Sequence, residues 1–266
     1  MKFTTISQAK KWTGLAYLGG INTSSKIMKN QTVSHNYTYL LYLAPANTSG
    51  YNVCSHSTPE CRLGCLATSG RAAIELRLEH RTIEKARIKK SRLFNENQEF
   101  FMDWLVAEIA QYRRKAVKDG YDFSVRLNGT SDIDWVNIKL NGLNIFEIYN
   151  DVQFYDYTKN GGKFLSKPGN YHLTLSYTGR NNEAVIATLK AGHNVAVIFN
   201  VKKESELPTM FDGFEVVNGD LTDYRVNDGN GKVIGLKWKN IANREVNQQI
   251  KESLFVIQPN DKRNKR

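Results

Sequence analysis

Short strand candidates alternate with helical or loop connections along this chain, and this alternation constrains its fold more than any other feature. Apolar and aromatic runs of strand length recur eight times, at 37–44, 123–127, 152–155, 171–177, 195–200, 214–217, 233–237 and 254–257. Helical spacing occurs at 72–94, 97–118 and 183–191. Connections of this length favour parallel β/α units. We therefore predict an α/β fold, an irregular or incomplete (β/α)8-type barrel, with an open doubly wound sheet as the alternative.

Composition points to a folded protein outside the membrane. Of the 266 residues, 41% are hydrophobic and 11% aromatic, which is too apolar for a disordered chain. No stretch approaches the roughly 18 apolar residues of a membrane helix, and the first residues lack the apolar region of a secretory signal. We predict a cytoplasmic protein without a membrane partner.

The chain shows no internal linker that would separate two domains. Residues 1–36 are polar and weakly periodic, and we predict an extension that wraps the surface. Residues 37–258 then form a single barrel-like domain with a cysteine loop at 45–70. The last segment, 259–266, is basic and predicted to be disordered.

All three cysteines of the chain lie within that one polar loop. Cys54, Cys61 and Cys65 have the spacing C-x6-C-x3-C. Because the sequence shows no export signal, we do not expect these cysteines to form disulfides. Three thiolates suit an iron–sulfur cluster, and we predict that these cysteines hold a 4Fe-4S cluster. The alternative is zinc with His56 as the fourth ligand. For the 4Fe-4S cluster the fourth ligand is left open: it is either His56 or an exogenous group.

Polar residues follow the strand at 123–127, where the functional groups of a β/α barrel gather. Asn128, Thr130, Ser131 and Asp132 are therefore candidate cofactor-binding residues. The same residue types are also typical of a turn or a helix cap, and the sequence favours neither the cofactor-binding role nor the structural role. Asp156 follows the strand at 152–155, and there we favour a solvated turn.

The charge balance favours a polyanionic partner. The chain has 37 Lys and Arg residues against 26 Asp and Glu residues, a formal net charge of +11. Such a field attracts nucleic acid, and basic residues are dense over 71–92. We consider a nucleic-acid contact there, although a solvated outer helix has the same pattern.

Three blocks of the sequence are similar to a known phage protein family, the "gene product 88" type. They are residues 51–71 with the three cysteines, residues 11–14 and residues 126–134. The resemblance spans most of the chain and implies a phage protein in the cytoplasm of an infected bacterium. The family supplies no function to carry over.

At one remove, the predicted architecture resembles that of radical-SAM enzymes, in which a three-cysteine loop after the first barrel strand holds a 4Fe-4S cluster. That resemblance implies S-adenosylmethionine as a candidate second cofactor. The spacing here differs from the C-x3-C-x2-C of those enzymes, Gly64 replaces their aromatic residue, and their Gly-Gly-Glu-type motif is missing. These departures weaken the implied S-adenosylmethionine site more than the predicted cluster.

Two functions follow from these observations. The first is an iron–sulfur protein whose cluster performs redox or Lewis-acid chemistry on a small-molecule ligand, with its enzymatic status left open. The second is a nucleic-acid-binding protein in which the metal site is structural.

Overall fold

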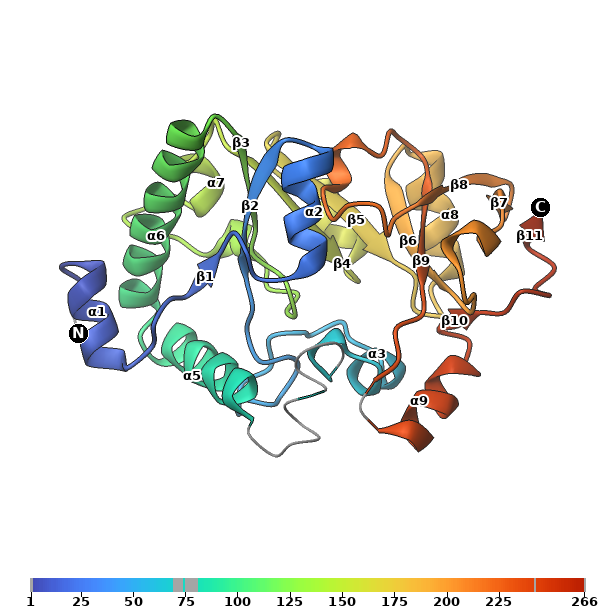
Figure 1. Ribbon diagram of the computed structural model, residues 1–266, viewed down its shortest axis with the longest axis horizontal. Coiled ribbons are helices and arrows are strands. Elements are labelled where there is room, and N and C mark those ends of the chain that lie inside the picture. Colours follow the sequence, from blue (N-terminus) through green and yellow to red (C-terminus); the bar gives the residue numbers. More distant parts are fainter. Residues whose placement is uncertain (1, 69–73, 75–80, 242, 266) are drawn as a thin grey trace. The chain divides into compact units, whose positions relative to one another are not determined.

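The computed structural model describes residues 2–68, 74, 81–241 and 243–265 (Figure 1). Within it the chain divides into two compact units. Unit 1 contains residues 1–55, 81–156 and 167–172, and unit 2 contains residues 56–80, 157–166 and 173–266. The predicted division into an extension, one domain and a tail is not tested by this partition and stays a prediction.

Unit 1 is built on a short, mainly parallel set of strands. Its elements are α1 (Ile6–Thr13), β1 (Gly19–Gly20), α2 (Ser25–Val33), β2 (Asn36–Leu41), α5 (Thr82–Glu96), α6 (Gln98–Asp119), β3 (Asp122–Arg126), η2 (Trp135–Asn137), α7 (Ile145–Ile148) and the first part of β4 (Gln153–Thr158). β2 pairs in parallel with β3, and β3 with β4, whereas β1 runs antiparallel to β2. Asn36 lies opposite Asp122 in this register.

The two faces of β2 contact different helices, because successive side chains of a strand point to opposite faces. Tyr39 donates a hydrogen bond to Glu108 of α6 at 2.6 Å. Thr38, on the other face, accepts one from Asn30 of α2 at 2.9 Å. α2 and α6 therefore cover opposite faces of β2.

The helix α6 carries the main core stripe of unit 1. Phe101, Leu105 and Ile109 recur at helical spacing, as the sequence predicts, and each is fully buried. The helix ends at Gly120, whose φ of 77° is left-handed and whose amide bonds back to the last turn.

Unit 2 has its own parallel strands and its own core. Its elements are α3 (Pro59–Leu63), η1 (Leu66–Thr68), η3 (Gly161–Leu165), most of β5 (Tyr171–Ser176), α8 (Asn182–Lys190), β6 (Asn194–Phe199), η4 (Glu204–Glu206), β7 (Met210–Phe211), β8 (Phe214–Asn218), η5 (Arg225–Asn227), β9 (Val233–Lys237), α9 (Arg244–Lys251), β10 (Val256–Ile257) and β11 (Asn264–Lys265). The strands β5, β10 and β9 pair in parallel with β6, and β8 pairs in parallel with β9. β7 is antiparallel to both β8 and β11. Leu175, Val195, Val197 and Val233 form the centre of its apolar core.

The predicted α/β class is confirmed, but the predicted (β/α)8-type barrel is not. No closed (β/α)8 or radical-SAM-type barrel is shown by the described residues. A barrel of that type consists of parallel strands alone. Here β1 is antiparallel to its partner in unit 1, and β7 is antiparallel to both of its partners in unit 2. Among the described residues, none of the helices has the length and apolar character needed to cross a membrane.

Candidate functional site

Cys54 and Cys61 have different surroundings, and the three cysteines form no metal site within the described residues. The Cys54 thiol donates to the Thr130 carbonyl at 3.7 Å and accepts from the Ala46 amide at 3.4 Å. Cys61 lies on α3 and packs against an apolar cluster of unit 2 that includes Trp238 and Ile250. None of the three is in a disulfide within the described residues.

The predicted metal cofactors are therefore wrong. Over residues 2–68, 74, 81–241 and 243–265, no group of three or more His, Cys, Asp and Glu side chains could hold a metal ion. This overturns the 4Fe-4S cluster on Cys54, Cys61 and Cys65, and also the zinc alternative with His56. It also removes the basis for a radical-SAM-like site with S-adenosylmethionine. The physical reason is visible at Cys54 and Cys61, whose side chains are used in loop and core packing.

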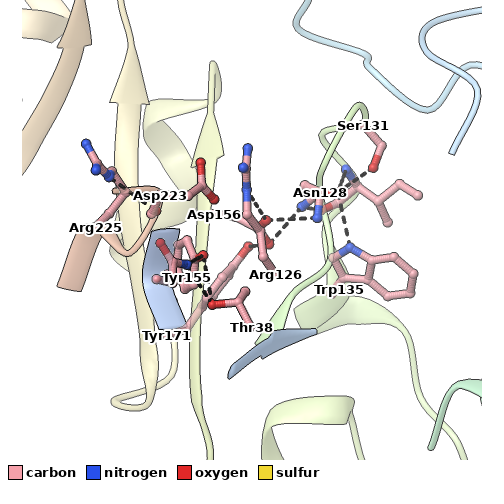
Figure 2. A network of polar contacts seen from close by, with 12 residues as sticks. Thr38, Arg126, Asn128, Ser131, Trp135, Tyr155, Asp156, Tyr171, Asp223 and Arg225 are labelled. Carbon is pink, nitrogen blue, oxygen red and sulfur yellow. Dashed lines mark hydrogen bonds and ion pairs between the residues drawn. The ribbon is translucent and has the colours of Figure 1, made fainter. Parts of the chain in front are cut away.

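The segment after β3 folds around Asn128, one of the predicted cofactor-binding residues. Its side-chain oxygen accepts from Ser131 Oγ at 2.8 Å, from the Ile133 amide at 2.9 Å and from Trp135 Nε1 at 3.1 Å. In Figure 2 Asn128 lies between the Asp156 carboxylate and the Trp135 ring. Asn128 is 3% exposed, and its side-chain oxygen is fully occupied by these hydrogen bonds within the protein.

The other residues of this segment join two loops of unit 1. Thr130 Oγ1 donates to the Leu43 carbonyl at 2.5 Å, and the Asp132 amide donates to the Val53 carbonyl at 2.8 Å. Asp134 accepts from Asn137 at 2.7 Å in the manner of a turn. The contacts of Asn128, Thr130, Ser131 and the Asp132 backbone are those of a folded loop, and their role in binding a cofactor stays a prediction.

Asp156 is a buried acceptor rather than part of a solvated turn. It lies within β4 and is 1% exposed. Its carboxylate accepts from the Asn128 amide at 2.8 Å and from the Tyr171 hydroxyl at 3.0 Å, and Arg126 Nε lies 3.9 Å away. Burial, followed by the neighbouring Asp156 charge, raises the pKa of Tyr171 well above its ordinary value. Tyr171 therefore stays a hydrogen-bond donor to Asp156 at neutral pH (Figure 2).

A second buried network connects the N-terminal segment to α5 and α6. Glu108 accepts from the Gly19 amide at 2.8 Å and from Tyr39, and Lys90 donates to the Leu18 carbonyl at 2.6 Å. Burial lowers the pKa of Lys90 to about 8, and burial raises the pKa of Glu108. The sequence analysis missed both residues. Glu108 interrupts the apolar stripe of α6 next to Ile109, and that interruption is the signal that could have identified it.

The exposed side of α5 is basic. The helix contains five Lys or Arg residues against two Glu residues. Lys85, Lys89 and Arg92 recur at spacings of four and three residues, and all are exposed. The helix thus presents a row of cations, with Glu84 lying nearer to Arg81, 3.7 Å away, at its first turn.

The last turn of α1 brings two further cations to this row. Lys10 and Lys11 are exposed there, four and three residues before the cap residue Gly14. A Cβ placed on Gly14 would lie 3.1 Å from Lys89 Nζ, so the end of α1 is next to α5. We call Lys10, Lys11, Lys85, Lys89 and Arg92 the basic face of unit 1. Part of the predicted basic segment, residues 71–73 and 75–80, lies outside the described residues.

Comparison with protein families identifies the family of this chain. The family model described as "Gene product 88" matches residues 10–257. The chain therefore belongs to the Gene product 88 family, as the resemblance implied. Comparison with curated proteins gave no match, and neither did comparison with solved structures.

Proposed function

We propose that this protein binds nucleic acid through the basic face of unit 1. The observation that carries the proposal is the convergence of cations from two helices, with Lys89 of α5 lying beside the cap residue Gly14 of α1. Phosphate groups are the partners that such a row of Lys and Arg attracts, and contacts of this kind dominate nucleic-acid affinity.

The charge of the whole chain supports the same partner. A formal net charge of +11 increases the rate at which a polyanion meets the protein. The cations of the basic face lie on the two helices α1 and α5, so the spacing of their Cα atoms within each helix is fixed. The exposed side chains of α5 from Lys85 to Arg92 are all basic, which is the charge that a phosphate backbone attracts.

The test measures binding of labelled single strands and duplexes of about 20 nucleotides across about 50 to 200 mM salt. Each phosphate contact contributes roughly −0.7 to −0.9 to the slope of log affinity against log salt. The variant K11Q/K85Q/K89Q removes three positive charges from the basic face. We expect it to reduce the size of the slope by about 2 and to weaken binding at least 10-fold.

The matched control removes three charges from exposed lysines of unit 2, in the variant K202Q/K203Q/K262Q. It changes the net charge equally and should alter affinity by less than about 3-fold. Equal weakening in both variants would show that only net charge matters, and would contradict a defined face. Wild-type protein that binds neither single strands nor duplexes would reject the proposed function.

A further inference from the structure

Two exposed aromatic side chains lie close in sequence to the α1 cations of the basic face. Trp12, in the last turn of α1 next to Lys11, is 50% exposed. Tyr17, three residues after the cap Gly14, is also 50% exposed. Aromatic side chains exposed near basic residues are the arrangement on which unpaired bases stack.

The packing of these two rings holds them in place without covering them. The Trp12 ring contacts Phe100 edge to face, with centroids 5.2 Å apart. The Lys90 ammonium lies 4.6 Å from the centroid of the Tyr17 ring, and it also donates to the Leu18 carbonyl next in the chain. Each ring is therefore supported on one side, and half of each side chain stays exposed.

A purely structural role explains only part of this arrangement. The contact with Phe100 accounts for the buried half of Trp12. The other half of the Trp12 side chain is exposed, in the same turn of α1 as Lys10 and Lys11. The two aromatic positions are five residues apart in number, so their Cα atoms lie within roughly 18 Å of each other.

We propose that the basic face takes single-stranded nucleic acid, with Trp12 and Tyr17 as the residues on which bases stack. This inference rests on the proposed function and narrows its substrate class. Phosphates contact the lysines of α1 and α5, and unpaired bases lie against the two rings. In a duplex the bases are already stacked within the helix, so the rings gain little from it.

The deciding experiment compares three probes on the full chain: a dT oligomer of about 20 nucleotides, the same backbone without bases, and a duplex. An rU oligomer of the same length shows whether RNA is bound like DNA. The variant W12L keeps an apolar contact with Phe100 but removes the stacking surface. We expect W12L to bind the dT oligomer at least 5-fold more weakly than wild type. Its binding to the base-free backbone and to the duplex should change less than about 2-fold.

Two further variants make the result specific to stacking. W12F restores an aromatic ring and should recover most of the affinity for the dT oligomer. Y121L is the control, because Tyr121 is an aromatic residue of unit 1 that stacks on Tyr37 and lies between Asp119 and Asp122. We expect Y121L to bind the dT oligomer as wild type does. Thermal unfolding of each variant confirms that it is folded.

Tryptophan fluorescence gives an independent readout. The chain has four tryptophans, and the other three are 0%, 1% and 9% exposed: Trp104, Trp135 and Trp238. Quenching by the dT oligomer should therefore come from Trp12 and be lost in W12F. If W12L and wild type bind the dT oligomer equally while K11Q/K85Q/K89Q loses binding, stacking is overturned and the proposed function stands. If wild type binds no probe, both fail.

Discussion

Lys90 and Glu108 bind the carbonyl and the amide of the same residue, Leu18, in unit 1. The Lys90 ammonium donates to the Leu18 carbonyl at 2.6 Å, and the Glu108 carboxylate accepts from the Leu18 amide at 3.1 Å. Both side chains are buried. Their contacts fix the connection between α1 and β1, which carries Tyr17 and places α1 beside α5.

Lys90 should make the stability of the protein depend on pH in the weakly alkaline range. Its folded-state pKa is about 8, against an ordinary value of 10.5, because burial disfavours the ammonium. Between these two pH values the unfolded chain binds more protons than the folded protein, so the free energy of unfolding rises with pH. Below about pH 8 Lys90 is charged in both states, and the folded protein bears the full cost of burying its ammonium. We expect a gain of about 2 kcal/mol between about pH 7.5 and 9.5 from this residue.

Urea unfolding at those two pH values measures the gain, and K90M should abolish it. The exposed variant K118M should retain it. Tyr39 and Tyr112 have raised pKa values, which lower stability as pH increases, so the difference between K90M and wild type is the quantity to compare. An identical pH dependence in K90M would show that Lys90 is not the titrating group.

Removing the negative charge of Glu108 should cost more stability while Lys90 remains than in its absence. In E108Q the buried ammonium loses its nearby carboxylate, and we expect a loss of about 3 kcal/mol in unfolding free energy. In the background of K90M the same substitution should cost less than about 2 kcal/mol. A double-mutant cycle by urea unfolding checks this, and strictly additive costs would mean that the two charges are not coupled.

Gly129 lies where the loop after β3 meets the end of β2. A Cβ at this position would lie 2.6 Å from the Leu41 carbonyl oxygen and 2.7 Å from Tyr42 Cδ1. We expect G129A to destabilise the protein by about 1–3 kcal/mol, as overpacking does. G169A is the matched control, since no atom lies within 4 Å of its added Cβ. Thermal unfolding that ranks G169A as the more damaging change would contradict this packing.

Asp156 should be required for folding of the segment after β3. In D156N an amide group would replace one of the oxygens that accept from the Asn128 amide and the Tyr171 hydroxyl. We expect a loss of about 2–4 kcal/mol in unfolding free energy. D134N, at an exposed turn, should lose less than about 1 kcal/mol. Should D156N prove as stable as D134N, the network around Asn128 would not be the anchor described above.

Much of the fold could be predicted because its elements have strong local patterns. Phe101, Leu105 and Ile109 predict α6, and the run at 195–200 predicts β6. The helices α1 and α2 were not predicted, since they are short and mostly polar. The packing of α1 also depends on a distant partner, Phe100. Whether a sheet closes depends on strand pairing, and short antiparallel strands such as β1 and β7 carry little signal of their own.

The site was harder to predict because spacing in sequence does not fix spacing in space. The dense cysteine loop suggested convergence, yet Cys54 contacts the Thr130 carbonyl while Cys61 packs in an apolar cluster. The basic segment was visible in the sequence, but its junction with α1 was not. That junction depends on Lys89 lying beside Gly14, a contact between residues far apart in the chain.

The salt dependence of single-strand binding tests the central claim most directly. Affinity for a dT oligomer of about 20 nucleotides is measured across about 50 to 200 mM salt for wild type, K11Q/K85Q/K89Q and K202Q/K203Q/K262Q. The basic face predicts a steep slope for wild type, a slope smaller by about 2 for K11Q/K85Q/K89Q, and a wild-type slope for the unit 2 control. Absence of salt-dependent binding, or the same slope in all three proteins, would contradict it.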